Sequence, residues 1–376
     1  MTRLMRCLVL LLPALLCAAS CAQTSHRWAA TCDSHGNLHA IECRQVDGTV
    51  VYRAWDGKQW SDPQVVWTGL VPFNPALAVD PQDRVHLVWG DAAGSMDNAD
   101  LFHVVLQEGA WSDPEDVTEA AGWEWGPSLA ILPNGDMHLT WQSAQGVFAV
   151  NNQERGIRVT GINPCLWHRV CRNGEWSLPS PIVQQSNTFG CLSVDSKGGL
   201  YIAYVVGQIP PQAGIRYARY EADGWGAAEQ VSGVVGVTSW NPPLIAADGA
   251  GGLHLLYTPL ATPQAAYCRK IGDQWEGPSS MGTMVSGSNA CALVAGPDGT
   301  IHLAYPEKAG IAKSCLAYTR YQDGKWTTPV PAIPEAPQEI AMAADAQGNA
   351  HIVWGAPNRF GHVYSKGGQW LVGAQG

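Results

Sequence analysis

Apolar and polar residues alternate in short runs along most of the chain that follows residue 26. In one stretch, residues 75–118, four such runs occur: PALAV, VHLVW, LFHVVL and EDVT. The turn sequences PQDR and QEGAWSD separate the first run from the second and the third from the fourth. A two-residue period with β-branched and aromatic residues is typical of β-strands. Since no segment has a convincing helical period, the pattern predicts an all-β protein.

The four runs belong to a unit that recurs seven times. Each unit contains a small apolar strand, a turn with glycine or another turn residue, and then a marker residue followed by apolar-x-aromatic. Internal repetition at this length is typical of stacked or radial architectures. The seven markers are His39, His86, His138, Tyr201, His254, His302 and His351.

A second pattern follows each marker: an aromatic residue or histidine, then a tryptophan eight residues later. The seventh unit appears shorter, because Tyr364 and Trp370 are six residues apart. We interpret these pairs as packing between neighbouring units. The other six are Tyr52/Trp60, His103/Trp111, His168/Trp176, Tyr217/Trp225, Tyr267/Trp275 and Tyr318/Trp326.

Seven units of about 50 residues with four strands each predict a seven-bladed β-propeller. We expect residues 23–376 to form this single domain, and we expect irregular structure in the long insertion at 142–166. The repeated histidine is best interpreted as structural, satisfying backbone groups inside each blade.

The first 22 residues have the pattern of a secretory signal peptide. Arg3 and Arg6 precede a 13-residue apolar run, which is too short to span a bilayer. Two processing alternatives remain open: cleavage before Gln23, or a bacterial lipobox in which Cys21 is acylated. We therefore expect an exported protein without a transmembrane span, either secreted, periplasmic or anchored as an outer-membrane lipoprotein.

Charge and cysteine content narrow the picture further. The formal net charge is −10 and no basic patch is evident, which excludes nucleic-acid binding. Eight cysteines follow the signal segment, and export permits disulfides. We expect the pairs Cys32/Cys43 and Cys165/Cys171, while the other four could be thiols or disulfides. The spacings typical of zinc sites do not occur, so we expect no metal and no cofactor.

The repeat D-x-x-G-x-x-H-apolar-x-W, followed by a DG-x-W-S-x-P segment, resembles the BNR or Asp-box repeats of sialidase-like β-propellers. Examples of the second segment are WDGKQWSDP at 55–63 and QEGAWSDP at 107–114. The resemblance covers nearly all of residues 26–376 and implies the propeller fold. The FRIP-like motif and the three carboxylate-binding arginines of sialidases are not matched, so it implies little about sialidase activity.

The start of each blade's first strand is the position that we expect to form a binding face. Propeller symmetry brings these positions around one axis, where loops from every blade form a concave funnel. Aromatic and amide side chains gather there, and such side chains bind sugar rings and hydroxyls. The predicted ligand-binding residues are Phe73, Trp123, Trp125, Trp240, Asn241 and Asn289.

Charged residues near the same face are the candidates for chemistry. Glu124 lies between two tryptophans, where desolvation would raise its pKa toward that of a general acid. Asp91 and Glu154 are further carboxylates, while Arg155 and Arg359 could hold an anionic sugar. Nothing in the sequence places two carboxylates at the separation that glycoside hydrolysis requires.

The sequence favours a binding function over catalysis. No GxSxG, HExxH, P-loop or dinucleotide-binding motif occurs in its required context. We expect a monomer that binds a glycan or another cell-surface polymer. The alternatives are a carbohydrate-active enzyme, either a glycoside hydrolase or a polysaccharide lyase, and a protein-interaction scaffold in the cell envelope.

Overall fold

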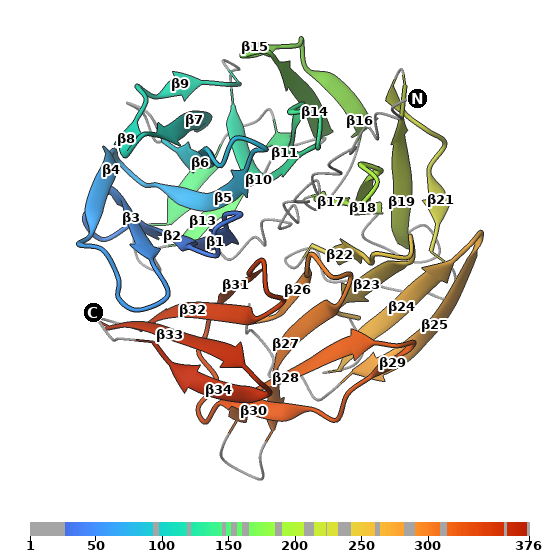
Figure 1. Ribbon diagram of the computed structural model, residues 1–376. Coiled ribbons are helices and arrows are strands. Elements are labelled where there is room, and N and C mark those ends of the chain that lie inside the picture. The colour runs from blue at the N-terminus through green and yellow to red at the C-terminus, as the bar shows by residue number, and fades with distance from the viewer. Residues whose placement is uncertain are drawn as a thin grey trace, which may run out of the picture.

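The computed structural model describes residues 27–92, 98–118, 122–144, 148–151, 156–159, 165–184, 190–206, 214–222, 224–231, 242–259, 264–281, 290–308, 314–356 and 359–373. These residues form seven antiparallel sheets in a closed ring (Figure 1), and a separate two-stranded sheet. Within these ranges there is no helix. The predicted seven-bladed β-propeller is confirmed.

The blades follow one another in chain order. Blade 1 consists of β1 (Trp28–Cys32), β2 (Leu38–Arg44), β3 (Thr49–Trp55) and β4 (Gln64–Thr68). Blade 2 consists of β5 (Phe73–Val79), β6 (Val85–Asp91), β7 (Asp100–Gln107), β8 (Ala110–Trp111) and β9 (Glu115–Asp116). Blade 3 consists of β10 (Trp123–Ile131), β11 (Met137–Ala144), β14 (Cys165–Arg172), β15 (Glu175–Trp176) and β16 (Ser180–Gln184). Blade 4 consists of β17 (Cys191–Val194), β18 (Leu200–Val206), β19 (Gly214–Glu221), β20 (Gly224–Trp225) and β21 (Glu229–Gln230).

The remaining three blades complete the ring. Blade 5 consists of β22 (Leu244–Ala247), β23 (Leu253–Tyr257), β24 (Ala265–Ile271) and β25 (Gln274–Met281). Blade 6 consists of β26 (Ala292–Ala295), β27 (Ile301–Lys308), β28 (Ser314–Gln322), β29 (Lys325–Trp326) and β30 (Val330–Ile333). Blade 7 consists of β31 (Ala341–Ala344), β32 (Ala350–Ala356), β33 (Arg359–Lys366) and β34 (Gln369–Val372).

The first strand of each blade lies innermost, where it contacts the first strands of its neighbours. The outermost strand is divided in several blades: β8 and β9, for instance, both pair with β7. A proline follows the hairpin tryptophan in this region, as in QEGAWSDP. Because proline cannot donate to a sheet ladder, it limits pairing of the exposed edge with other chains.

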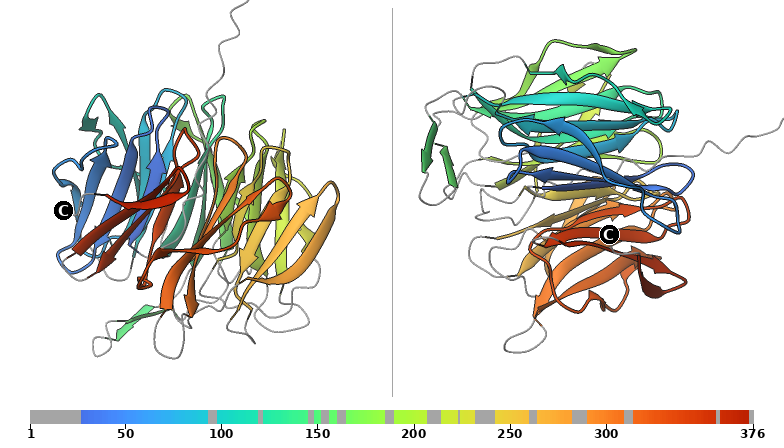
Figure 2. Two further views of the ribbon diagram at one scale, coloured as in Figure 1. Left: turned by 60° about the horizontal axis from the view of Figure 1, so that its bottom comes forward. Right: turned by 90° about the vertical axis from the view of Figure 1, so that its left-hand side faces the viewer.

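The insertion in blade 3 contains regular structure in its described part. β12 (Phe148–Asn151) and β13 (Gly156–Val159) pair as an antiparallel hairpin. Figure 2 shows this hairpin standing away from the disc formed by the blades. The expectation of a wholly irregular insertion is therefore wrong for these residues.

The repeated histidine binds two groups within its own blade. In blade 5, His254 Nδ1 lies 2.7 Å from the Tyr267 hydroxyl, and Nε2 lies 3.2 Å from the carboxylate of Asp248 in the turn. His86 and His302 are likewise buried and bonded to the third strand of their own blade. The predicted structural role of these histidines is confirmed, but the expectation that they satisfy backbone groups is wrong, because these partners are side chains.

Blades 3 and 6 depart from this pattern because they lack the turn aspartate. Leu132 takes its place in blade 3 and Gly296 in blade 6. As a result, Nε2 of His138 and Nε2 of His302 are buried without a hydrogen-bond partner. Each histidine still bonds through Nδ1 to the third strand, in blade 3 to His168 at 3.0 Å.

The hairpin tryptophan of each blade packs edge-on against the third-strand aromatic residue of the preceding blade. At all seven junctions of the described chain the ring centroids lie 4.8 to 5.8 Å apart, and the ring planes cross at 74° to 87°. Such edge-to-face contacts are favourable. The pairs are Trp60/His362, Trp111/Tyr52, Trp176/His103, Trp225/His168, Trp275/Tyr217, Trp326/Tyr267 and Trp370/Tyr318.

The seventh unit has the same spacing as the others. Its third-strand partner is His362, which pairs with Val353 two residues after the marker His351, as Tyr52 pairs with Ile41 in blade 1. From His362 to Trp370 is again eight residues, so the expected assignment to Tyr364 is wrong.

The two predicted disulfides are not formed. In blade 1, Cys32 pairs with Leu38 at one end of the β1–β2 ladder, while Cys43 lies five residues further along β2. Both Cys165 and Cys171 belong to β14. At about 3.3 Å per residue the members of each pair are roughly 16–20 Å apart, well beyond the ~7 Å limit for a disulfide.

Candidate functional site

At the predicted rim, Phe73 and Trp123 pack against each other and are buried. Their ring centroids are 5.8 Å apart with an interplanar angle of 15°, and their side chains are 6% and 2% exposed. Phe73 lies over Gly90, where even a Cβ would come within 2.4 Å of the phenyl ring. The expectation that these two rings offer exposed faces to a sugar is therefore wrong.

The other predicted rim residues are placed only in part. Trp125 is half-buried and packs against the cluster that contains Phe73 and Trp123. Trp240, Asn241 and Asn289 lie outside the described residues. The structure therefore leaves the predicted ring of aromatic and amide groups at the channel mouth as a proposal.

Asp91 joins blade 1 to blade 2. The carboxylate is fully buried and accepts hydrogen bonds from Trp67 Nε1 at 2.6 Å and from the backbone N–H groups of Leu70 and Val71 at 3.2 and 2.8 Å. Both oxygen atoms are thus used to hold the segment that leads from β4 to β5. This arrangement gives Asp91 a structural role and not a catalytic one.

Glu124 is buried below the rim, with 1% of its surface exposed. Burial and, to a lesser extent, the nearby Asp100 and Asp116 raise the pKa of its carboxyl group to about 7, against the lowering effect of hydrogen bonds with Thr118 and Ser143. The expected rise in pKa is confirmed. Since Glu124 Oε2 is enclosed and has no hydrogen-bond partner, the carboxyl group is not exposed to a substrate in this structure.

The remaining candidates are not placed by the structure. Glu154, Arg155 and Cys21 lie outside the described residues, and Arg359 lies at the start of β33 without a described side chain. Within the described ranges no group of three or more His, Cys, Asp or Glu residues is arranged to hold a metal ion. The same ranges contain no helix long and apolar enough to cross a membrane.

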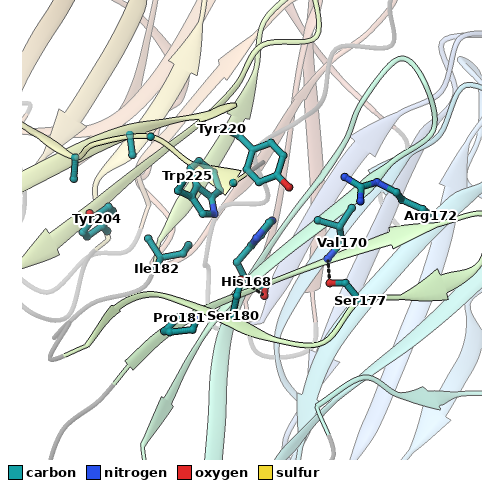
Figure 3. Close-up of a pocket in the computed structure, with 14 residues that line it drawn as sticks. His168, Val170, Arg172, Ser177, Ser180, Pro181, Ile182, Tyr204, Tyr220 and Trp225 are labelled. Atoms are coloured by element: carbon teal, nitrogen blue, oxygen red, sulfur yellow. Dashed lines mark hydrogen bonds between the residues drawn. The ribbon is translucent and has the colours of Figure 1, made fainter. Parts of the chain in front are cut away.

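An open crevice of about 370 Å³ lies between the outer strands of blades 3 and 4. Its walls come from β14 and β16 on one side and from β19 and β20 on the other. Figure 3 shows His168, Tyr220 and Trp225 turned toward one another, with Arg172 beside Tyr220. A crevice of this size is within the range of small-ligand sites.

The polar groups on the crevice wall differ in their accessibility. The indole Nε1 of Trp225 is buried without a partner, as are the Nε1 atoms of Trp60, Trp111, Trp275 and Trp326 at other blade junctions. Arg172 Nε donates to Asp136 at 3.0 Å, which leaves the other N–H groups of the guanidinium directed toward Tyr220 and the crevice. By contrast, the Ser177 hydroxyl is occupied, since it accepts from Val170 and donates to Leu178.

Ala218 lines the crevice at a strand position where two other blades carry an arginine and the remaining four carry Val104, Cys268, Thr319 and Val363. At the same strand position in blade 3, Arg169 crosses to the preceding blade, where it donates to the backbone carbonyl of Val117 and covers the Trp176 ring. In blade 1, Arg53 covers the Phe360 ring of blade 7 in the same way. Alanine at this position leaves the equivalent space of the blade 3–4 junction empty.

Comparisons with known proteins support the fold. No protein-family model matches the chain, and no curated protein matches it in sequence. Many solved structures are similar. A Hadza microbial sialidase has 11% identity and a TM-score of 0.54, covering 82% of this chain and 72% of its own.

Two further structures cover more of the chain. A lectin from Aleuria aurantia, solved with Fucα1-6GlcNAc, has 13% identity and a TM-score of 0.51, covering 94% of this chain and 97% of its own. An ulvan lyase of polysaccharide lyase family PL25 has 10% identity and a TM-score of 0.56, covering 90% of this chain and 92% of its own. At these identities the likeness establishes the propeller fold alone.

The crevice was missed by reasoning from the sequence. His168 and Trp225 were assigned to packing, which is correct, but the space beside them depends on Ala218 and on the neighbouring blade. A comparison of the seven units at the position after the third-strand aromatic residue would have shown arginine in two of them and alanine in blade 4.

Proposed function

We propose that this chain is an exported carbohydrate-binding propeller without catalytic activity, which holds a saccharide in the crevice between blades 3 and 4. The observation that carries the proposal is the open crevice with aromatic and donor groups on its wall. The sugar-binding lectin among the similar structures supports the same class of ligand. The channel mouth, with Trp125, Trp240, Asn241 and Asn289, remains a second proposed binding position.

The crevice suits a sugar for physical reasons. One face of a pyranose ring carries apolar C–H groups, which leave water favourably when they pack on the half-buried rings of Tyr220 and Trp225. The guanidinium of Arg172 can donate to ring or hydroxyl oxygens.

Binding is favoured over hydrolysis or lyase chemistry by the positions of the carboxyl groups. None of the described residues that line the crevice carries one. Glu124, whose pKa of about 7 would suit a general acid, is 1% exposed and lies at the rim of blade 3. A general acid must reach the atom that it protonates.

A substitution that fills the crevice with a larger side chain tests the proposal. Ala218→Arg places the side chain that occupies this position in blades 1 and 3 into the crevice, and should reduce retention on a glycan array at least tenfold. Trp225→Ala should have a similar effect. The matched control is Trp326→Ala, which removes the corresponding tryptophan at the junction of blades 5 and 6 and should leave retention unchanged.

The melting temperature of each variant separates loss of binding from loss of fold. If folded Ala218→Arg protein retains glycans as the wild type does, the crevice is not the binding site. Retention that falls only when Trp125 is replaced would move the site to the channel mouth.

We also propose export directed by residues 1–22, with or without acylation of Cys21. Mass spectrometry of the protein from the producing cell tests this. A mature N-terminus at Gln23 indicates free secretion, a diacylglyceryl group on Cys21 indicates a lipoprotein, and an intact Met1 start would contradict export.

A further inference from the structure

His168 lines the same crevice, and His138 lies behind it; this pair differs from the corresponding pairs in other blades. His138 Nδ1 and His168 Nε2 are 3.0 Å apart, and the two rings are stacked at 5.2 Å. The two side chains are 0% and 3% exposed. While both imidazoles are neutral, each carries one N–H, and one ring donates its N–H to the unprotonated nitrogen of the other.

An additional proton, which would make one ring of this pair a cation, has no carboxylate beside the rings to neutralise it. In blade 2, His86 lies 3.3 Å from Asp80 and His103 lies 3.7 Å from Glu115. In blade 7, His351 lies 3.3 Å from Asp345. In blade 3 the corresponding turn residue is Leu132, and His138 Nε2 has no partner.

The charged and titratable groups that face the pair are few among the described residues. They are Asp136 on the β10–β11 turn, Arg172 at the end of β14, and the phenol of Tyr220 on β19. The carboxylate of Asp136 is already bound to Arg172 at 3.0 Å. The local charge of these neighbours therefore sums to zero.

The pair also supports the aromatic wall of the crevice. Tyr220 meets His138 edge-on at 4.7 Å and His168 at 5.3 Å, while Trp225 meets His168 at 5.3 Å. Tyr220 and Trp225 are themselves 5.3 Å apart. Any movement of the histidine rings must therefore move the two residues on which we place the sugar.

We propose that the His138–His168 pair is an acid-sensitive latch, which closes the wall of the crevice at neutral pH and releases the bound saccharide in acid. The inference rests on the proposed function of the crevice. Protonation places a cation among buried aromatic rings without a counter-ion, which is unfavourable because the charge is desolvated. The cost is removed when the rings turn out toward water.

The direction of the pH dependence follows from linkage. Burial lowers the pKa of His138 to about 4 and that of His168 to about 3, whereas an exposed histidine titrates near 6.5. Below about pH 6.5 the open state therefore binds protons that the closed state does not bind. The closed wall is fully favoured above that pH and loses its advantage progressively as the pH falls toward 3–4.

Leu132→Asp is the variant that tests the latch, since Leu132 does not line the crevice. Its turn has the backbone bonds of the aspartate turns: Leu132 N–H to Asp136 O, as Asp248 N–H to Gly252 O. An aspartate there should face His138 as Asp248 faces His254, raising the histidine pKa toward that of the open state. Leu132→Asn is the control, because it supplies a similar shape without the charge.

The experiment is a glycan array scanned at pH 7.5, 6, 5 and 4.5 with wild type and both variants. Wild type and Leu132→Asn should lose about tenfold or more of their retention between pH 7.5 and 5, while Leu132→Asp should change less than about threefold. A wild type that binds equally at pH 7.5 and 4.5, or a Leu132→Asp variant as acid-sensitive as the wild type, would overturn the latch.

A measurement without glycan separates this inference from the proposed function. The indole N–H of Trp225 can be followed by hydrogen exchange and NMR beside that of Trp326, which faces the similar box of His254, Tyr267 and Tyr321 with Asp248 as counter-ion. Trp225 should lose protection relative to Trp326 as the pH falls from 7 to 5. Parallel exchange of the two indoles contradicts the latch, whereas failure of the wild type to retain any glycan contradicts only the proposed function.

Discussion

At the scale of single residues, the repeated histidine can form a hydrogen bond through each of its two ring nitrogens. Its contribution to stability depends on how many of these bonds are made. His254 binds both Tyr267 and Asp248, whereas His302 binds Tyr318 and leaves Nε2 without a partner. Removing His254 leaves Tyr267 and Asp248 without this hydrogen-bond partner, whereas removing His302 leaves only Tyr318 without one.

We therefore expect His254→Ala to lower the free energy of unfolding by about 2–4 kcal/mol, and His302→Ala by about 1 kcal/mol less. Urea denaturation at pH 7.5 measures both. Equal losses would mean that the carboxylate of Asp248 contributes nothing to the histidine site, and unchanged stability in both would contradict the structural role.

Glu124 should make the stability of the protein depend on pH in the opposite sense to the buried histidines. Its pKa is about 7 in the folded protein and about 4.5 in the unfolded chain. Between these values the folded state retains a proton that the unfolded state has lost, so this contribution to stability is full below about pH 4.5 and is lost as the pH rises through 7.

Glu124→Gln keeps the shape of the neutral side chain and removes its titration. The variant should lose less stability than the wild type between pH 5 and pH 8, as measured by urea denaturation at each pH. If the difference between the two proteins is the same at pH 5 and pH 8, Glu124 titrates normally and is not enclosed as described.

At the scale of elements, the order of the strands could be predicted from the sequence, but the side-chain contacts between them could not. The four apolar runs of blade 2 fall on β5, β6, β7 and β9, although β5 and β6 are buried on both faces and the short strand β8 was not predicted. The predicted disulfides failed because residues close in sequence, such as Cys165 and Cys171, are far apart when both lie in one extended strand. The burial of Phe73 was not predicted, because it depends on a contact with Gly90 on the neighbouring strand, which strand alternation does not reveal.

Ring closure is the element-level feature with the clearest consequence. Blades 1 and 7 are each built from consecutive strands, so no strand is exchanged across their junction. Side-chain contacts hold the two blades together: Phe360 of blade 7 contacts Trp28, Trp60 and Arg53 of blade 1.

Phe360→Ala should therefore destabilise the protein by about 3–5 kcal/mol, the usual cost of removing a buried phenyl ring. Native-state hydrogen exchange should show the loss of protection concentrated in blades 1 and 7, because the ring opens there first. Uniform loss of protection over all seven blades would contradict this account of closure.

At the scale of the whole molecule, the sequence predicted the ring of seven blades because the repeat is carried by residues that every blade needs. The crevice could not be predicted in this way, since it depends on the contact between two neighbouring blades and on side chains that the repeat does not share, such as Ala218, Tyr220 and Arg172. The described residues that line it include one arginine and no carboxylate, in a chain whose formal charge is −10.

The most direct test of the carbohydrate-binding account is a crystal structure of the protein soaked with the glycan that the array retains best. The account predicts a sugar ring packed on Tyr220 and Trp225, within hydrogen-bond distance of the guanidinium of Arg172. A sugar bound at the channel mouth with the crevice empty, or a protein to which no glycan on the array binds, would contradict it.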